Sequence, residues 1–158
     1  MKKDELELFV KELKLLDEAA KILVYSYEAC REIGIKESYA LEELDKFEAL
    51  TSRFARTSDM LIQRIFRLID VLELEKPGST IDRINRAEKR NLISSGEVFK
   101  EIRYLRNEIA HEYLPMAIEQ MFKEVLRLTP HLIDSIGRIQ KWEPDLNGIK
   151  QWSFKTDE

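Results

Sequence analysis

The chain has 158 residues, 44% of them hydrophobic and 35% charged, and a formal net charge of −4. This length and apolar content suit one domain around a single core. Five glycines and four prolines allow few turns, which favours long amphipathic helices over a sheet. The sequence contains no long uncharged apolar run, and its first residues alternate charge with leucine, so it predicts neither a membrane span nor a signal peptide. We therefore expect a cytoplasmic protein without membrane association.

Cysteine and histidine usage argues against two kinds of stabilising site. Cys30 is the only cysteine, so an internal disulfide is impossible, and we expect its thiol to be a buried, small apolar group. The two histidines, His111 and His131, are far apart in the sequence, which disfavours a zinc site with the usual number of ligands. We accordingly expect no metal and no cofactor.

Positive charge gathers in the middle third of the chain. Residues 53–106 carry 12 Lys and Arg against 8 Asp and Glu, whereas residues 1–52 carry 8 against 13 and residues 107–158 carry 6 against 9. Most of the basic residues in the middle third are arginines, whose guanidinium groups suit bidentate contacts with phosphate. Two interpretations are open at this point: the solvated faces of charged helices, or a phosphate-binding surface.

Apolar residues at alternating steps of three and four predict two long helices at the start of the chain. The first is expected over residues 4–32, with Gly34 as its stop, and the second over residues 38–75. The expected buried seams are Leu6, Phe9, Leu13, Leu16, Ala20, Leu23 and Tyr27, then Leu44, Phe47, Thr51, Phe54, Ser58, Leu61, Ile65, Leu68 and Leu72.

Two capping boxes predict the helices that follow. Pro77-Gly78 breaks the chain, and a box over residues 79–82 restarts a short, basic surface helix that ends near Arg90. A second box, over residues 94–97, opens the next helix, whose buried side is expected to carry Val98, Ile102, Leu105 and Ile109.

Pro115 interrupts the pattern after this helix. A proline removes one helical hydrogen bond and disfavours helical geometry in the residue before it, so the helix should kink or end near residue 111. A last helix is expected over residues 115–141, bent at Thr129-Pro130. The fold class is therefore an all-α antiparallel bundle of four to five helices over residues 1–141. Residues 142–158 form an extension that should pack partly through Trp142 and Trp152 or fray.

Residues 106–113, with the sequence Arg-Asn-Glu-Ile-Ala-His-Glu-Tyr, hold the candidate chemistry. On a straight helix Arg106 and His111 lie about 140° apart, so backbone placement alone cannot direct both side chains to one phosphate. The length of the arginine, a disturbance by Pro115, or a site built from two copies across a two-fold axis would bring them together. We favour the last two in combination.

An imidazole can both take and return a proton near neutral pH, as cleavage of RNA by its own 2′-hydroxyl requires. A guanidinium can stabilise the extra negative charge at phosphorus, and Asn107, one turn before His111, could orient the imidazole or the phosphate. This chemistry needs no metal. The alternative is structural, because one Arg and one His on a helix also occur as an ion pair or as a capping histidine.

The spacing Arg106, Asn107, His111 and Tyr113 resembles the Arg-x4-His-x-Tyr signature of the HEPN superfamily, and most closely its HepT-type members. These are small helical bundles encoded beside minimal nucleotidyltransferases, and the similarity covers residues 5–140. The resemblance implies a metal-independent ribonuclease toxin whose site lies at a homodimer interface. Arg106 and His111 would be catalytic and Asn107 would support them.

In HepT-type toxins the partner nucleotidyltransferase acts as an antitoxin by attaching AMP to the tyrosine of the motif, which implies Tyr113 as the modification site. ATP would be used only by that partner. The structural alternative is that Tyr113 ends the apolar stripe of its helix. Four further residues are expected to contact RNA more weakly: Lys100, Arg103, Arg86 and Arg90.

Two other functions are weighed against a ribonuclease toxin. The chain could be a non-catalytic subunit that presents substrate to a minimal nucleotidyltransferase, since the same superfamily contains such subunits. It could also be a plain helical scaffold in which the motif is accidental.

Overall fold

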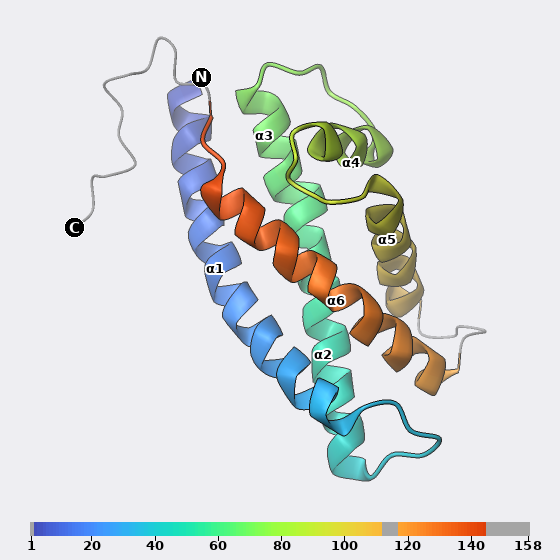
Figure 1. Cartoon of the computed structure of the whole chain (residues 1–158). Helices are drawn as coiled ribbons and strands as arrows, with labels where there is room; N and C mark the ends of the chain where they lie inside the picture. The colour runs from blue at the N-terminus through green and yellow to red at the C-terminus, as the bar shows by residue number, and fades with distance from the viewer. Residues whose placement is uncertain (1, 112–116, 145–158) are drawn as a thin grey trace.

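A computed structural model describes residues 2–111 and 117–144, and every regular element within these ranges is helical (Figure 1). The all-α prediction is therefore confirmed. The helices are α1 (Lys2–Ile33), α2 (Leu41–Asp59), η1 (Met60–Ile65), α3 (Phe66–Leu72), α4 (Thr80–Lys89), α5 (Gly96–Ala110) and α6 (Ile118–Lys141).

The rods formed by α1, by α2 with η1 and α3, by α5 and by α6 run up and down beside one another, and α4 lies across one end of the bundle (Figure 1). The rod made of α2, η1 and α3 packs along α1, and α5 and α6 both pack against α2. When α2, η1 and α3 are counted as one rod, the described part of the chain has five helical rods, which agrees with the four to five helices that the sequence predicts. Each rod buries one apolar stripe, because an amphipathic helix needs a partner for that face.

The first seam follows the predicted spacing. Leu6, Phe9, Leu16 and Leu23 are at most 1% exposed, and Cys30 extends the stripe by one further step of seven. The helix ends at Gly34, which has a φ of +73° and donates its amide hydrogen to the carbonyl of Cys30 at 3.0 Å. Glycine adopts this left-handed conformation without a Cβ penalty.

The second rod contains a feature that periodicity does not predict. Between α2 and α3 the six residues of η1 form a π-helix, in which amide hydrogens bond to the carbonyl five residues back. Phe66, which caps the segment, donates to the carbonyl of Leu61 in this way. Helical structure thus continues from Leu41 to Leu72, but its register changes within η1.

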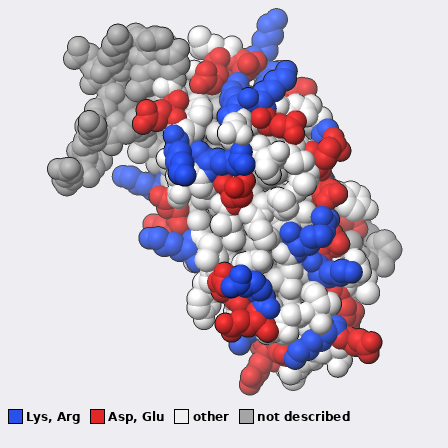
Figure 2. Space-filling model, viewed as in Figure 1, with Lys and Arg blue, Asp and Glu red and all other residues white. Residues whose placement is uncertain are grey.

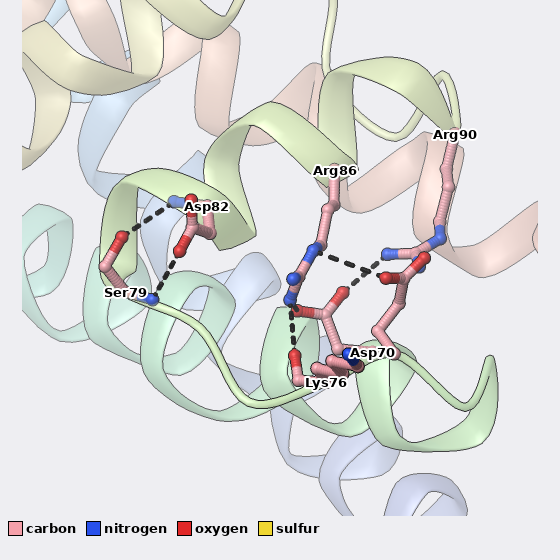
Figure 3. A network of polar contacts seen from close by, with 7 residues as sticks. Asp70, Lys76, Ser79, Asp82, Arg86 and Arg90 are labelled. Atoms are coloured by element: carbon pink, nitrogen blue, oxygen red, sulfur yellow. Dashed lines mark hydrogen bonds and ion pairs between the residues drawn. The ribbon is translucent and has the colours of Figure 1, made fainter.

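A nearly buried carboxylate clamps α4 onto α3 (Figure 3). Asp70 is 6% exposed and accepts hydrogen bonds from Arg86 at 2.9 Å and from Arg90 at 2.6 Å. Both arginines also pair with Glu75, at 3.6 and 3.3 Å. The helix begins at Ser79, whose hydroxyl and amide exchange hydrogen bonds with Asp82 as the predicted capping box requires.

The capping box predicted over residues 94–97 at the start of α5 is wrong. The N-cap is Ser95, not Ser94, and its hydroxyl accepts from the amide of Val98 at 3.2 Å. The carboxylate that completes the cap comes from α4, because Glu88 accepts from the amide of Gly96 at 2.7 Å. A Cβ at position 96 would lie 3.2 Å from that carboxylate, so glycine allows the close approach.

Helix α6 continues through Pro130 as one element. The hydroxyl of Thr129, the residue before this proline, donates to the carbonyl of Val125 at 2.6 Å. Ile118, the first residue of α6, is 56% exposed. Beyond the helix, the ring of Trp142 packs edge-on against Phe9 at 5.5 Å, so the extension contacts the bundle at its first residue as predicted.

Charges of both signs are interspersed over the face in Figure 2, with uncharged surface between the groups. None of the described helices is both long and apolar enough to span a membrane. Within residues 2–111 and 117–144, no three His, Cys, Asp or Glu side chains gather where they could hold a metal ion.

Candidate functional site

A basic cleft lies between the π-helical segment and α5, and it includes the start of the candidate motif. Its volume is about 410 Å³, within the range of small-ligand sites. One wall comes from the end of α2 and from η1, and the other from α5. The lining residues are Ser58, Asp59, Ile62, Gln63, Arg64, Arg103, Arg106 and Asn107.

Asp59 holds Arg106 in a two-point ion pair. The Nε of Arg106 donates to Oδ1 of Asp59 at 2.7 Å and Nη2 donates to Oδ2 at 2.8 Å. These hydrogen bonds raise the pKa of the Arg106 guanidinium, which stays charged at any physiological pH. Both side chains are more than a third exposed, so the pair adds at most about 1 kcal/mol of stability. Its main effect is therefore to fix the direction of the guanidinium.

The geometry of this pair leaves one edge of the guanidinium for a ligand. A guanidinium has five N–H donors, and Asp59 takes one on Nε and one on Nη2. Of the remaining three, one on Nη1 and one on Nη2 form the second edge, which can bind a phosphate or carboxylate in a bidentate manner. Asp59 thus orients Arg106 without occupying the whole group.

Two more arginines give the cleft its positive charge. Arg103 lies one turn before Arg106 on α5, and Arg64 comes from η1 on the opposite wall. Asn107 is exposed and lines the same cleft. The lining therefore contains three guanidinium groups against one carboxylate, a balance that favours an anionic ligand.

His111 is the first residue after α5, in extended geometry with φ −100° and ψ 91°. Its amide donates to the carbonyls of Asn107 and Glu108, both at 3.2 Å, and so closes the helix. The prediction that the helix kinks or ends beside the motif is confirmed. Because the amide of His111 is still bonded into the last turn of α5, the exposed imidazole leaves the helix near the position calculated for a straight helix, well around the axis from Arg106. Tyr113 and Pro115 lie outside the described residues.

The four weaker RNA-contact candidates separate into different environments. Arg103 lines the cleft, whereas Lys100 lines another hollow, between α5 and α6, and pairs with Glu97 at 3.1 Å. Arg86 and Arg90 are committed to Asp70 in the α3–α4 clamp (Figure 3). Their charges are balanced within the protein, so only Arg103 of the four joins Arg106.

Sequence patterns did not identify Asp59, Gln63 or Arg64 as site residues. Asp59 is 47 positions from its arginine partner, a distance that local spacing cannot bridge. One weak signal existed: Ser58 interrupts the apolar seam of its helix. Ser58 is buried, its hydroxyl donates to the carbonyl of Phe54 at 2.8 Å, and the residue lines the cleft.

Comparison with known proteins gives no match: no family model, no curated protein and no solved structure is similar to this chain. The described fold and cleft define an all-helical bundle with an arginine-rich cleft that opens beside the end of α5.

Proposed function

We propose that the protein is a metal-independent endoribonuclease of the HEPN kind, acting as a homodimer. The observation that carries the proposal is the oriented guanidinium of Arg106 in a basic cleft, on the same helix that ends at His111. The Arg-x4-His-x-Tyr spacing adds the resemblance to HepT-type toxins.

In the proposed reaction, the 2′-oxygen of a ribose attacks the adjacent phosphorus and the bond from phosphorus to the 5′-oxygen breaks. His111 takes the proton of the 2′-hydroxyl and returns a proton to the leaving oxygen. Arg106 stabilises the charge that develops on the non-bridging oxygens through the edge that Asp59 leaves available. The products carry a 2′,3′-cyclic phosphate and a 5′-hydroxyl.

Two copies of the chain complete each site in this proposal. Arg106 is held toward the cleft by Asp59, whereas His111, the first residue after α5, is not part of the cleft lining. A two-fold axis near the end of α5 would bring the His111 of one copy to the cleft of the other.

RNA cleavage in excess EDTA tests the function. The wild type is expected to produce cyclic-phosphate ends, and His111→Ala to lose about 10²- to 10⁴-fold in rate, the usual contribution of a general acid–base. His131→Ala, on α6, is the matched control and should cleave like the wild type. If the wild type does not cleave but binds a minimal nucleotidyltransferase stably, the chain is its substrate-presenting subunit instead.

Regulation by the same kind of partner follows from the resemblance. The Tyr113 phenol would attack the α-phosphorus of ATP, forming tyrosyl-AMP and releasing pyrophosphate. An AMP group near Arg106 would place an anion where substrate phosphate binds. With the partner and ATP, the wild type is expected to gain the mass of AMP and lose cleavage, whereas Tyr113→Phe should keep cleaving. If wild type and Tyr113→Phe gained the same amount of AMP, Tyr113 would be ruled out as the modification site.

A further inference from the structure

The π-helical segment changes which residues face the cleft. In an α-helix, residues five apart point about 140° away from each other. In a π-helix the hydrogen bonds run between residues five apart, so a side chain five positions on returns close to the same face. Arg64 is five positions after Asp59, and both line the cleft with Arg106. The π-helix thus adds a cation that a regular helix would direct elsewhere.

Neither Arg64 nor Arg103 is fixed as firmly as Arg106. The Arg64 side chain is 58% exposed, and its nearest carboxylate oxygen, on Glu12, lies 3.7 Å away, beyond hydrogen-bond distance. Among the described residues, Arg103 has no ion-pair partner, although it is only partly exposed. Arg103 can therefore turn toward an incoming anion without breaking an ion pair. Arg64 makes no hydrogen bond that holds it, although its charge lies beside the buried Oε2 of Glu12.

The concave surface also continues past Arg64. A second hollow, formed by α1, α2 and η1, shares Asp59 and Arg64 with the cleft and adds Arg56 together with one carboxylate, Glu18. Arginines thus recur along one path from α5 across η1 toward α1. A phosphodiester backbone presents anions at regular intervals along such a path, whereas a single small anion would occupy only one position on it.

We propose that Arg64 and Arg103 form a second phosphate-binding position, which holds the RNA backbone phosphate next to the one bound by Arg106. This inference rests on the proposed ribonuclease function for the identity of the strand. It does not need cleavage to occur, so binding and catalysis can be tested separately. The substrate class it assigns is single-stranded RNA that crosses η1.

The test uses the full-length protein and a fluorescent 2′-O-methyl RNA oligonucleotide, which has no free 2′-hydroxyl and cannot be cleaved. Binding is measured by anisotropy over a range of KCl concentrations for wild type, Arg64→Ala and Arg103→Ala. Arg127→Ala is the matched control, because Arg127 pairs with Glu101 and Glu124 and lines the hollow between α5 and α6. Circular dichroism confirms that each variant is folded.

Arg64→Ala and Arg103→Ala are each expected to weaken binding on the order of tenfold at low salt. Each should also reduce the slope of log affinity against log salt by roughly 0.7, the value for one phosphate contact on a single strand. Arg127→Ala should match the wild type in both. The proposal is overturned if Arg64→Ala and Arg103→Ala bind like Arg127→Ala, or if the wild type does not bind the oligonucleotide. If the wild type binds the oligonucleotide but cleaves no RNA, and the two variants bind more weakly, the phosphate-binding position is supported and the ribonuclease function is rejected.

Discussion

Asp59 determines how the arginine of the motif can act. Its carboxylate holds one edge of the Arg106 guanidinium through two hydrogen bonds of 2.7 and 2.8 Å and leaves the other edge for a ligand. Asp59 is therefore a positioning residue in the proposed reaction, not a group that contacts the reacting atoms. Removing its charge should affect the rate more than it affects binding, because Arg106 keeps its charge but is no longer held firmly in the direction that the reaction needs.

Asp59→Asn tests this role. Asparagine is nearly isosteric but loses the charge-assisted pair, so kcat for RNA cleavage should fall on the order of tenfold. KM should stay level or decrease, since the cleft loses a negative charge. Asp134→Asn, which removes an exposed ion pair with Arg138 on α6, is the control and should change neither. An increase in KM with unchanged kcat would assign Asp59 to substrate binding instead.

Cys30 gives a second prediction at the scale of one residue. The thiol is 0% exposed, and burial raises its pKa from 9.0 to about 11, with Lys46 lowering it by a smaller effect. Between these two values the unfolded chain binds fewer protons than the folded one, so stability falls as pH rises. Between pH 8 and 10 the free energy of unfolding of the wild type should decrease by about 1 kcal/mol more than that of Cys30→Ala.

Urea denaturation at several pH values measures this difference. If the free energies of unfolding of wild type and Cys30→Ala changed equally with pH, the thiol would have the same pKa in the folded and the unfolded chain, and the prediction would be wrong. A thiol reagent provides an independent check: at pH 8 the native protein should not react, whereas the unfolded protein should react completely.

At the scale of elements, the sequence predicts which segments are helical and which faces are buried. The steps of three and four in α1 and α2 require a buried stripe, and glycine or proline marks the ends of the helices. The π-helix could not be found in this way. Leu61 and Ile65 are four apart and buried in η1, as they would be in an α-helix, so the apolar pattern does not record which carbonyl each amide binds.

The site is predictable only in the part that is local. Arg106, Asn107 and His111 lie within six consecutive residues, so their spacing can be recognised. Asp59 and Arg64 join Arg106 and Asn107 through the packing of α2 against α5, a contact that periodicity does not specify. The same limit applies to Arg86 and Arg90. As arginines in a basic segment they are expected to contact phosphate, but in the folded chain both form ion pairs with Asp70.

The N-terminus of the motif helix provides a test at this scale. Ser95 caps α5 by accepting from the amide of Val98, so Ser95→Ala should lower the free energy of unfolding by about 1 kcal/mol. Ser94→Ala, at the exposed neighbouring position, should change it by less than about 0.5 kcal/mol. Urea denaturation compares the two variants. A larger loss of stability in Ser94→Ala than in Ser95→Ala would contradict this and make Ser94 the N-cap, as the sequence pattern predicts.

At the scale of the whole molecule, the proposal depends on two copies sharing each site. A single bundle presents Arg106 inside the cleft and His111 at the end of the helix. If the copies associate near these ends, each dimer would contain two composite sites, and every site would take its arginine from one chain and its histidine from the other. Size-exclusion chromatography with light scattering should then find a dimer.

Mixing two inactive variants tests this central claim most directly. Arg106→Ala and His111→Ala are each expected to be nearly inactive alone in excess EDTA. After the two are unfolded and refolded together, half of the dimers should be mixed, and each mixed dimer has one intact site of two. The mixture should therefore recover about a quarter of the wild-type rate of RNA cleavage. A mixture as inactive as either variant alone, despite forming mixed dimers, would contradict the shared site.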